Sequence, residues 1–192
     1  GYAGLADEKW AGKLCLRTSA KVYNQSLVAM LISMLGERET ELIVRGWVKN
    51  LATEVFPNDT KLIQAIEAGQ CQVGIVNTYY FGRLQRDNPD IPVAVFWPAA
   101  DTGGVHVNVS GAGVTRHAKN PDGAVKLIEW MSSDAAQHLL GGDNMEYPAN
   151  PAVAPHELVA AWGSFDAMTM NVAEAGFNQA EAVKLMDRAG YR

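Results

Sequence analysis

The chain has 192 residues, of which 48% are hydrophobic and 19% are charged, so it is long enough to fold around one large core or two small lobes. Its 16 Lys and Arg residues stand against 21 Asp and Glu residues, which gives a formal net charge of -5. Because no cluster of basic residues could follow a phosphate backbone, this composition argues against nucleic acid as a partner.

Neither a membrane span nor a secretory signal is visible in the sequence. The most apolar window, 26–35, is far shorter than the roughly 20 apolar residues that a spanning helix needs. The first ten residues lack the basic and apolar regions of a signal peptide. We therefore expect that any signal peptide has been removed, or that the chain begins inside a longer protein.

The first half of the sequence alternates short apolar runs with segments of helical periodicity. The predicted strands and extended pieces are 13–18, 54–56, 71–76 and 91–97. The predicted helices are 20–35 and 37–50, followed by two more. The third helix is capped by Asn58-Asp59-Thr60 and ends at Gly69, and the fourth ends near Asn88. This alternation predicts an α/β fold with a doubly wound, mostly parallel sheet that helices cover on both faces.

A hinge-like break at 101–104 separates the two halves. The alternating residues of 105–109 predict a strand, and helices are expected from Asn120 to about Met131, from Ser133 through Leu140, from about Glu157, and from Glu174 to Ala189.

Two cysteines, Cys15 and Cys71, are too few for a structural zinc site, so they form either a disulfide or two buried thiols. In the usual doubly wound order the first strand lies between the second and the third. The strands that carry the two cysteines would then be parallel neighbours, at a spacing of about 4.8 Å that permits a disulfide. The alternative of two reduced core cysteines remains open at this point.

No catalytic constellation is present in the sequence. The four histidines are widely separated, and neither a nucleophile elbow nor a phosphate-binding loop occurs. The Gly-rich stretch 110–113 lacks the lysine of such a loop and is more typical of a close strand crossing. We therefore do not expect an enzyme.

Tyrosines stand at the two places where ligands of open α/β folds bind. Tyr79 and Tyr80 directly follow the predicted strand 71–76, and Tyr23 lies in the first turn of the helix after the first strand. A phenol with a pKa near ~10 normally keeps its proton, but a small, hard, trivalent cation can displace it. The alternative is amphipathic packing of a tyrosine pair at a sheet edge.

Several long motifs resemble the periplasmic ferric-ion-binding proteins, the substrate-binding components of bacterial ABC iron importers. They lie at 14–19, 21–29, 69–71, 74–80, 106–114, 146–148 and 186–191, so the likeness covers essentially the whole chain. The resemblance implies a type II periplasmic-binding-protein-like lobe plus part of a second lobe, and a periplasmic location. It also implies ferric ion as the cargo, with or without a synergistic anion such as carbonate, and an inner-membrane ABC permease as the partner.

The resemblance also assigns residues. The paired tyrosine ligands of the family match Tyr79 and Tyr80, and the third tyrosine of one subgroup matches Tyr23. Asn77 matches a position that helps to hold the anion in some members, and Arg17, Thr18 and Ser19 could assist. The oxidising periplasm favours the Cys15–Cys71 disulfide.

The sequence departs from the family at its start, because it begins where family members enter their second lobe. We expect residues 2–102 to form this second lobe, 103–150 to be the returning part of the first lobe, and 151–192 to be helices that pack back on the second. Because part of the first lobe is then missing, apolar faces on the helices from Pro121 to Leu140 would be exposed, so we expect either self-association through this surface or poor order of the region.

Two other functions are compatible with the same residues. A protein that binds a small oxyanion or another small ligand could use the tyrosines as hydrogen-bond donors. A lobe of a two-lobed transferase is a further alternative, but the lack of paired acid and base groups argues against it.

Overall fold

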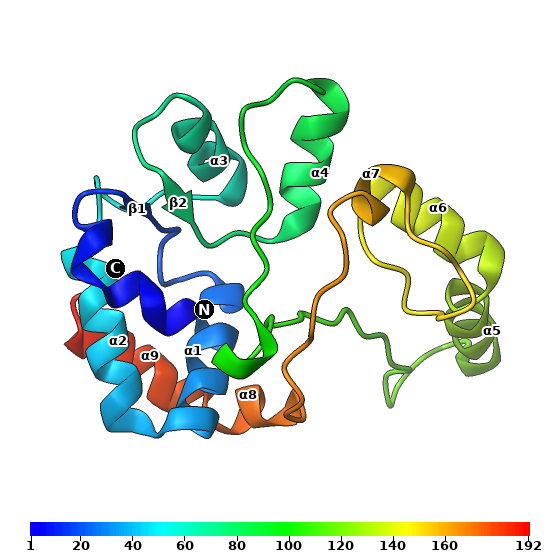
Figure 1. Cartoon of the computed structure of the whole chain (residues 1–192). Coiled ribbons are helices and arrows are strands. Elements are labelled where there is room, and N and C mark those ends of the chain that lie inside the picture. The colour runs from blue at the N-terminus through cyan, green and yellow to red at the C-terminus, as the bar shows by residue number, and fades with distance from the viewer. The chain divides into compact units, whose positions relative to one another are not determined.

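The computed structural model describes all 192 residues, and the chain forms two compact units (Figure 1). Unit 1 comprises Gly1–Asn77, Asp90–Val107 and Phe165–Arg192, and unit 2 comprises Thr78–Pro89 and Asn108–Ser164. Residues Thr78–Pro89 thus group with unit 2, whereas the sequence predicts that they belong to the lobe formed by residues 2–102. Compactness does not identify a lobe, so the lobe assignment stays a prediction. None of the helices is both long and apolar enough to cross a membrane.

Unit 1 contains most of the predicted helices of the first half. Its elements are η1 (Tyr2–Ala6), η2 (Glu8–Trp10), α1 (Val22–Leu35), α2 (Glu37–Lys49), α3 (Asp59–Glu67), η3 (Ala100–Thr102), α8 (Ala173–Phe177) and α9 (Gln179–Arg188). Gly36 separates α1 from α2 at a φ of 82°, which favours glycine. The Asn58 side chain accepts a hydrogen bond from the Lys61 N–H, so the predicted cap of α3 is confirmed.

The sheet of unit 1 is small and parallel. Strand β1 (Leu14–Cys15) pairs with β2 (Val73–Gly74), with Leu14 opposite Val73. On its other side, β1 and its extension form parallel bridges from Leu14 to Leu51 and from Arg17 to Phe56. The first strand therefore lies between the two later segments, as the doubly wound order predicts, although the regular ladder is shorter than expected.

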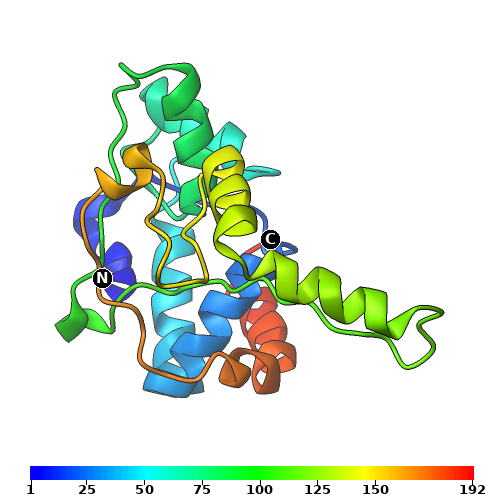
Figure 2. The same cartoon turned by 90° about the vertical axis from the view of Figure 1, so that its right-hand side faces the viewer.

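The core of unit 1 lies among α1, α2, α9 and the sheet. In both views these three helices lie side by side (Figure 1 and Figure 2). The largest fully buried side chain is that of Trp47, whose Nε1–H donates to the Tyr2 carbonyl oxygen at 2.9 Å. This contact fixes η1 on α2 and satisfies the indole donor inside the core.

Three predicted elements differ from the structure. Residues 91–97 alternate in burial, but they form no strand because no neighbouring segment pairs with them. Of the predicted strand 105–109, only Val105 forms a bridge, to Ala167. The predicted C-terminal helix is interrupted at Asn178, whose Nδ2 donates to Ser33 Oγ at 2.6 Å and so ties the break to α1.

Residues 101–104, predicted as a hinge-like break between the two halves, lie inside unit 1, where a short 3-10 helix ends at two glycines with positive φ, 98° at Gly103 and 76° at Gly104. A Cβ atom at Gly104 would lie 2.7 Å from the Asp166 carbonyl oxygen. The glycine allows the close approach in which the Val105 N–H donates to the same oxygen at 2.8 Å.

Unit 2 contains α4 (Thr78–Asp87), α5 (Pro121–Met131), α6 (Asp134–Asn144) and α7 (Glu157–Ala160). The side chains of Asn120 and Ser133 cap α5 and α6, as predicted. A short turn joins these two straight helices (Figure 2). No residue of α5 is buried, so its apolar side chains do not form a core.

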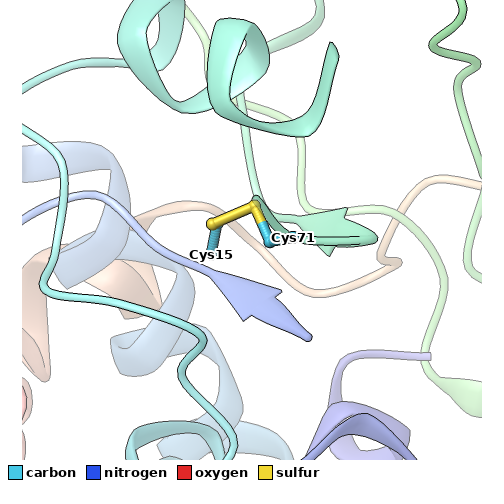
Figure 3. The surroundings of a disulfide bond; sticks show 2 residues. All are labelled: Cys15 and Cys71. Atoms are coloured by element: carbon cyan, nitrogen blue, oxygen red, sulfur yellow. A yellow bond between two sulfur atoms is a disulfide. The ribbon is translucent and has the colours of Figure 1, made fainter. Parts of the chain in front are cut away.

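A disulfide joins Cys15 to Cys71, with the two Cα atoms 5.9 Å apart (Figure 3). Both cysteines are almost fully buried, and they pack against Leu62 and Ala65 of α3. The bond connects β1 to the residues that lead into β2, so it holds the parallel pair together across 56 residues of sequence.

We predict that reduction of this disulfide lowers the free energy of unfolding by about 4 kcal/mol, because the unfolded chain regains the freedom of a long loop. Urea denaturation with and without reductant measures the difference. The double variant Cys15→Ala/Cys71→Ala is the control and should show no effect of reductant. Two free thiols in unreduced, unfolded protein would contradict the prediction.

Candidate functional site

Tyr23 is the second residue of α1 and lies shortly after β1 in unit 1. Its side chain is half-buried, and the Cζ atom of the Arg17 guanidinium lies 5.4 Å from the centroid of the phenol ring. This is within the range of a cation–π contact. The positive charge of Arg17 therefore stands beside the phenol that the sequence assigns to a metal site.

Arg17 itself is buried, with its side chain 2% exposed, and it pairs with Asp59 at the start of α3. Its Nη1 donates to Asp59 Oδ1 at 2.6 Å, and its Nη2 donates to Asn24 Oδ1 at 2.8 Å. The Asn24 amide in turn donates to the Thr18 carbonyl oxygen at 2.8 Å. These bonds connect the loop before α1 to both α1 and α3.

Two further bonds extend this network. The Asp59 Oδ1 atom also accepts the backbone N–H of Asn77 at 2.7 Å. The Tyr191 hydroxyl donates to the Arg17 carbonyl oxygen at 2.7 Å. Burial raises the pKa of the Tyr191 phenol far above its usual value, so Tyr191 remains a neutral donor at any physiological pH.

The structure gives specific positions to the residues predicted to hold an anion. Arg17 directs two donors to Asp59 and Asn24, inside the unit. Thr18 Oγ1 accepts the Ala20 N–H at 3.3 Å, and the Ser19 N–H donates to the Arg192 carbonyl oxygen at 3.1 Å. The backbone of Asn77 is bonded to Asp59. Direct anion binding by these residues stays a prediction.

Tyr79 and Tyr80 lie in the first turn of α4 in unit 2. Their ring centroids are 4.4 Å apart, with a tilt of 35° between the ring planes. The Cζ atom of Arg83 lies 5.1 Å from the centroid of Tyr79 and 5.2 Å from that of Tyr80. One guanidinium therefore faces both members of the pair.

Helix α4 is anchored by its other residues. Phe81 and Gly82 are buried, and the Phe81 ring packs on Trp162 with centroids 5.7 Å apart. The Trp162 indole N–H donates to Gln85 Oε1 at 2.8 Å. Because these contacts hold the opposite side of α4, both tyrosines stay half-buried at the start of the helix.

The structure thus brings Tyr79 and Tyr80 together under Arg83, and it places Tyr23 beside Arg17. Tyr23 belongs to unit 1 and the pair to unit 2, so the sharing of one ion by all three phenols stays a prediction. Sequence reasoning did not identify Arg83 or Asp59. The spacing of Arg83, three and four residues after the tyrosines, was a visible signal for a shared helix face.

No group of three or more His, Cys, Asp or Glu side chains is arranged to hold a metal ion.

Comparison with known proteins adds independent observations. The sequence model described as bacterial extracellular solute-binding protein matches residues 1–167. Iron uptake protein A1 from Synechocystis sp. strain PCC 6803 is 41% identical over 197 residues, which include the whole of this chain and 55% of that protein.

Solved structures agree with this likeness. A Trichodesmium protein (IdiA, FutA) in complex with iron and citrate ligands has 39% identity and a TM-score of 0.94, and the alignment covers all of this chain and 62% of that one. A ferric binding protein from Campylobacter jejuni has 31% identity and a TM-score of 0.94, with 100% and 63% covered. The chain therefore spans less than two thirds of the length of these relatives.

The packing of α4 generates a stability prediction. A Cβ atom at Gly82 would lie 2.6 Å from the Met145 Cβ atom, so Gly82→Ala should destabilise unit 2 by about 1–3 kcal/mol through overpacking. Gly142→Ala in α6 is the matched control, because nothing lies within 4 Å of its Cβ position. Chemical denaturation followed by circular dichroism measures both, and equal stability of the two variants would contradict the assigned packing.

Proposed function

Because the chain belongs to the family of bacterial extracellular solute-binding proteins, we propose that it binds ferric ion through tyrosine phenolates in the periplasm and delivers the ion to an ABC importer of the inner membrane. The observation that carries the proposal is the pair of Tyr79 and Tyr80, whose rings are in contact at the start of α4 and are faced by one guanidinium. No catalytic step is part of this function.

The chemistry of the residues supports ferric ion as the cargo. Phenolate oxygen is a hard, anionic ligand, and a trivalent cation can displace the phenol proton. Tyr79 and Tyr80 supply two such oxygens, and Tyr23 supplies the third. Arg83 and Arg17 place positive charge beside the rings, which offsets part of the negative charge that develops when the phenols lose their protons.

An accompanying anion completes the proposed site. Asn77, Thr18 and Ser19 stand at or near the strand-to-helix junctions that precede the tyrosines, and we propose them as its neighbours. Arg17 contributes charge from inside the unit, because its guanidinium is bonded to Asp59 and Asn24. Carbonate or a carboxylate such as citrate has the charge that such a site accepts.

Titration of the 192-residue chain with ferric citrate tests the function. We expect a visible phenolate-to-iron charge-transfer band, and we expect Tyr79→Phe and Tyr80→Phe each to weaken ferric binding at least tenfold because each removes one anionic ligand. Tyr23→Phe should have a smaller or equal effect. Each phenol that binds should release about one proton, so each variant should also reduce the proton release on binding.

Tyr2→Phe is the matched control for this titration. Burial raises the pKa of the Tyr2 phenol, so this group stays protonated and takes no part in the band. If the chain binds an oxyanion such as phosphate with no visible band on addition of ferric ion, the proposal of an iron carrier is wrong and that of an oxyanion-binding protein takes its place.

We also propose that a second copy of the chain covers the apolar side chains of α5. Leu127 and Trp130, which lie three residues apart on one face of α5, are 56% and 49% exposed, and α5 buries no residue. Large apolar side chains exposed together on a helix face are characteristic of an interaction surface. A two-fold dimer would bury the same face on both copies.

Sedimentation equilibrium tests this association. We expect a concentration-dependent dimer, and we expect Trp130→Glu to shift the chain to monomer, because it places a charge in the apolar contact. Leu42→Glu on α2 is the control, since Leu42 is also 56% exposed but belongs to unit 1. A wild-type chain that stays monomeric at all concentrations would refute the proposal.

A further inference from the structure

The ion pair of Arg17 and Asp59 lies inside unit 1, with side chains 2% and 3% exposed. Removal of two opposite charges from water is costly, and apolar residues of similar volume are often as stable as a buried pair or more so. The contribution of the pair to stability therefore does not by itself account for its presence. Its contacts indicate a different role.

The arginine end of the pair fixes the junction that carries Tyr23. The Arg17 backbone forms the bridge to Phe56, and its Nη2 donates to Asn24, the neighbour of Tyr23 on α1. The guanidinium also lies over the ring of Tyr23. Arg17, which follows β1, thus contacts both the Asn24 side chain and the ring of Tyr23.

The aspartate end fixes the second junction. The oxygen atom that accepts from Arg17, Asp59 Oδ1, also accepts the N–H of Asn77 at 2.7 Å. Asn77 is the last residue of unit 1 before Thr78, and Tyr79 and Tyr80 follow two and three residues after it. One carboxylate oxygen therefore bonds to both the arginine and the chain segment that leads to the tyrosine pair.

We propose that Arg17 and Asp59 are positioning residues of the tyrosine site, an inference that rests on the proposed function. They bind neither the ion nor the anion directly. Arg17 orients the ring of Tyr23, and Asp59 sets the direction in which the chain leaves Asn77 toward Tyr79 and Tyr80. Because one ion pair serves both junctions, a change at either residue alters the position of the tyrosines.

The double variant Arg17→Met/Asp59→Leu tests this role, since it replaces the pair by apolar residues of similar volume and keeps the fold. We expect its ferric affinity, measured by competition with citrate, to fall at least tenfold and its charge-transfer band to shift. Val44→Ala is the control, because Val44 is fully buried in the same unit but lies on α2, which carries neither residue of the ion pair and neither tyrosine junction. It should lower stability and leave ferric affinity within about twofold.

A readout without iron separates this inference from the proposed function. In chain labelled with 3-fluorotyrosine, the ¹⁹F resonances of Tyr23, Tyr79 and Tyr80 should shift or broaden in the double variant, while that of Tyr147 should not. If these resonances move but the wild-type chain binds no ferric ion, the positioning role stands and the proposed cargo is wrong. Unmoved resonances, or ferric affinity equal to wild type, would overturn the positioning role.

Discussion

A salt bridge enclosed by protein must be held by hydrogen bonds on every side, because the two charges have given up their hydration. The pair of Arg17 and Asp59 meets most of this requirement: the guanidinium donates to Asp59 and Asn24, and Asp59 also accepts the Asn77 N–H, whereas Arg17 Nε is buried without a partner. The Tyr191 hydroxyl, on the Arg17 carbonyl oxygen, adds the C-terminal segment. Stretches of unit 1 that are far apart in sequence thus converge on one point, and the small sheet is ordered around it.

The sequence predicts those parts of the fold that depend on local signals. The caps at Asn58, Asn120 and Ser133 are encoded within a few residues, and each is found where expected. Residues 91–97 have the alternation of a strand but form none, because a strand also needs a neighbour that the local pattern cannot supply. The order of the sheet was predictable only because alternating strands and helices restrict the topology.

In the candidate site, too, some features follow from local sequence patterns and others depend on contacts between distant residues. The tyrosines could be proposed as ligands because they follow predicted strands, and the carboxyl ends of parallel strands are common binding positions. Arg17 was assigned to an anion from its place in a motif, whereas its guanidinium lies 2.6 Å from Asp59. The partner stands 42 residues away in sequence, and no local pattern indicates which carboxylate an arginine will meet. Arg83 was missed although its helical spacing was visible, because arginines on exposed helix faces are common.

The bond from Tyr191 to Arg17 spans 174 residues, and this long separation governs when unit 1 can be completed. On the ribosome, Arg17 is made early, but Tyr191, whose hydroxyl donates to the Arg17 carbonyl oxygen, is added only after all of unit 2 has been synthesised. Contacts of such high sequence separation slow folding, because the chain must first pay the entropy of closing the loop. The hydrogen-bond network around Arg17 can therefore be completed only after Tyr191 has been synthesised, late in the production of this chain.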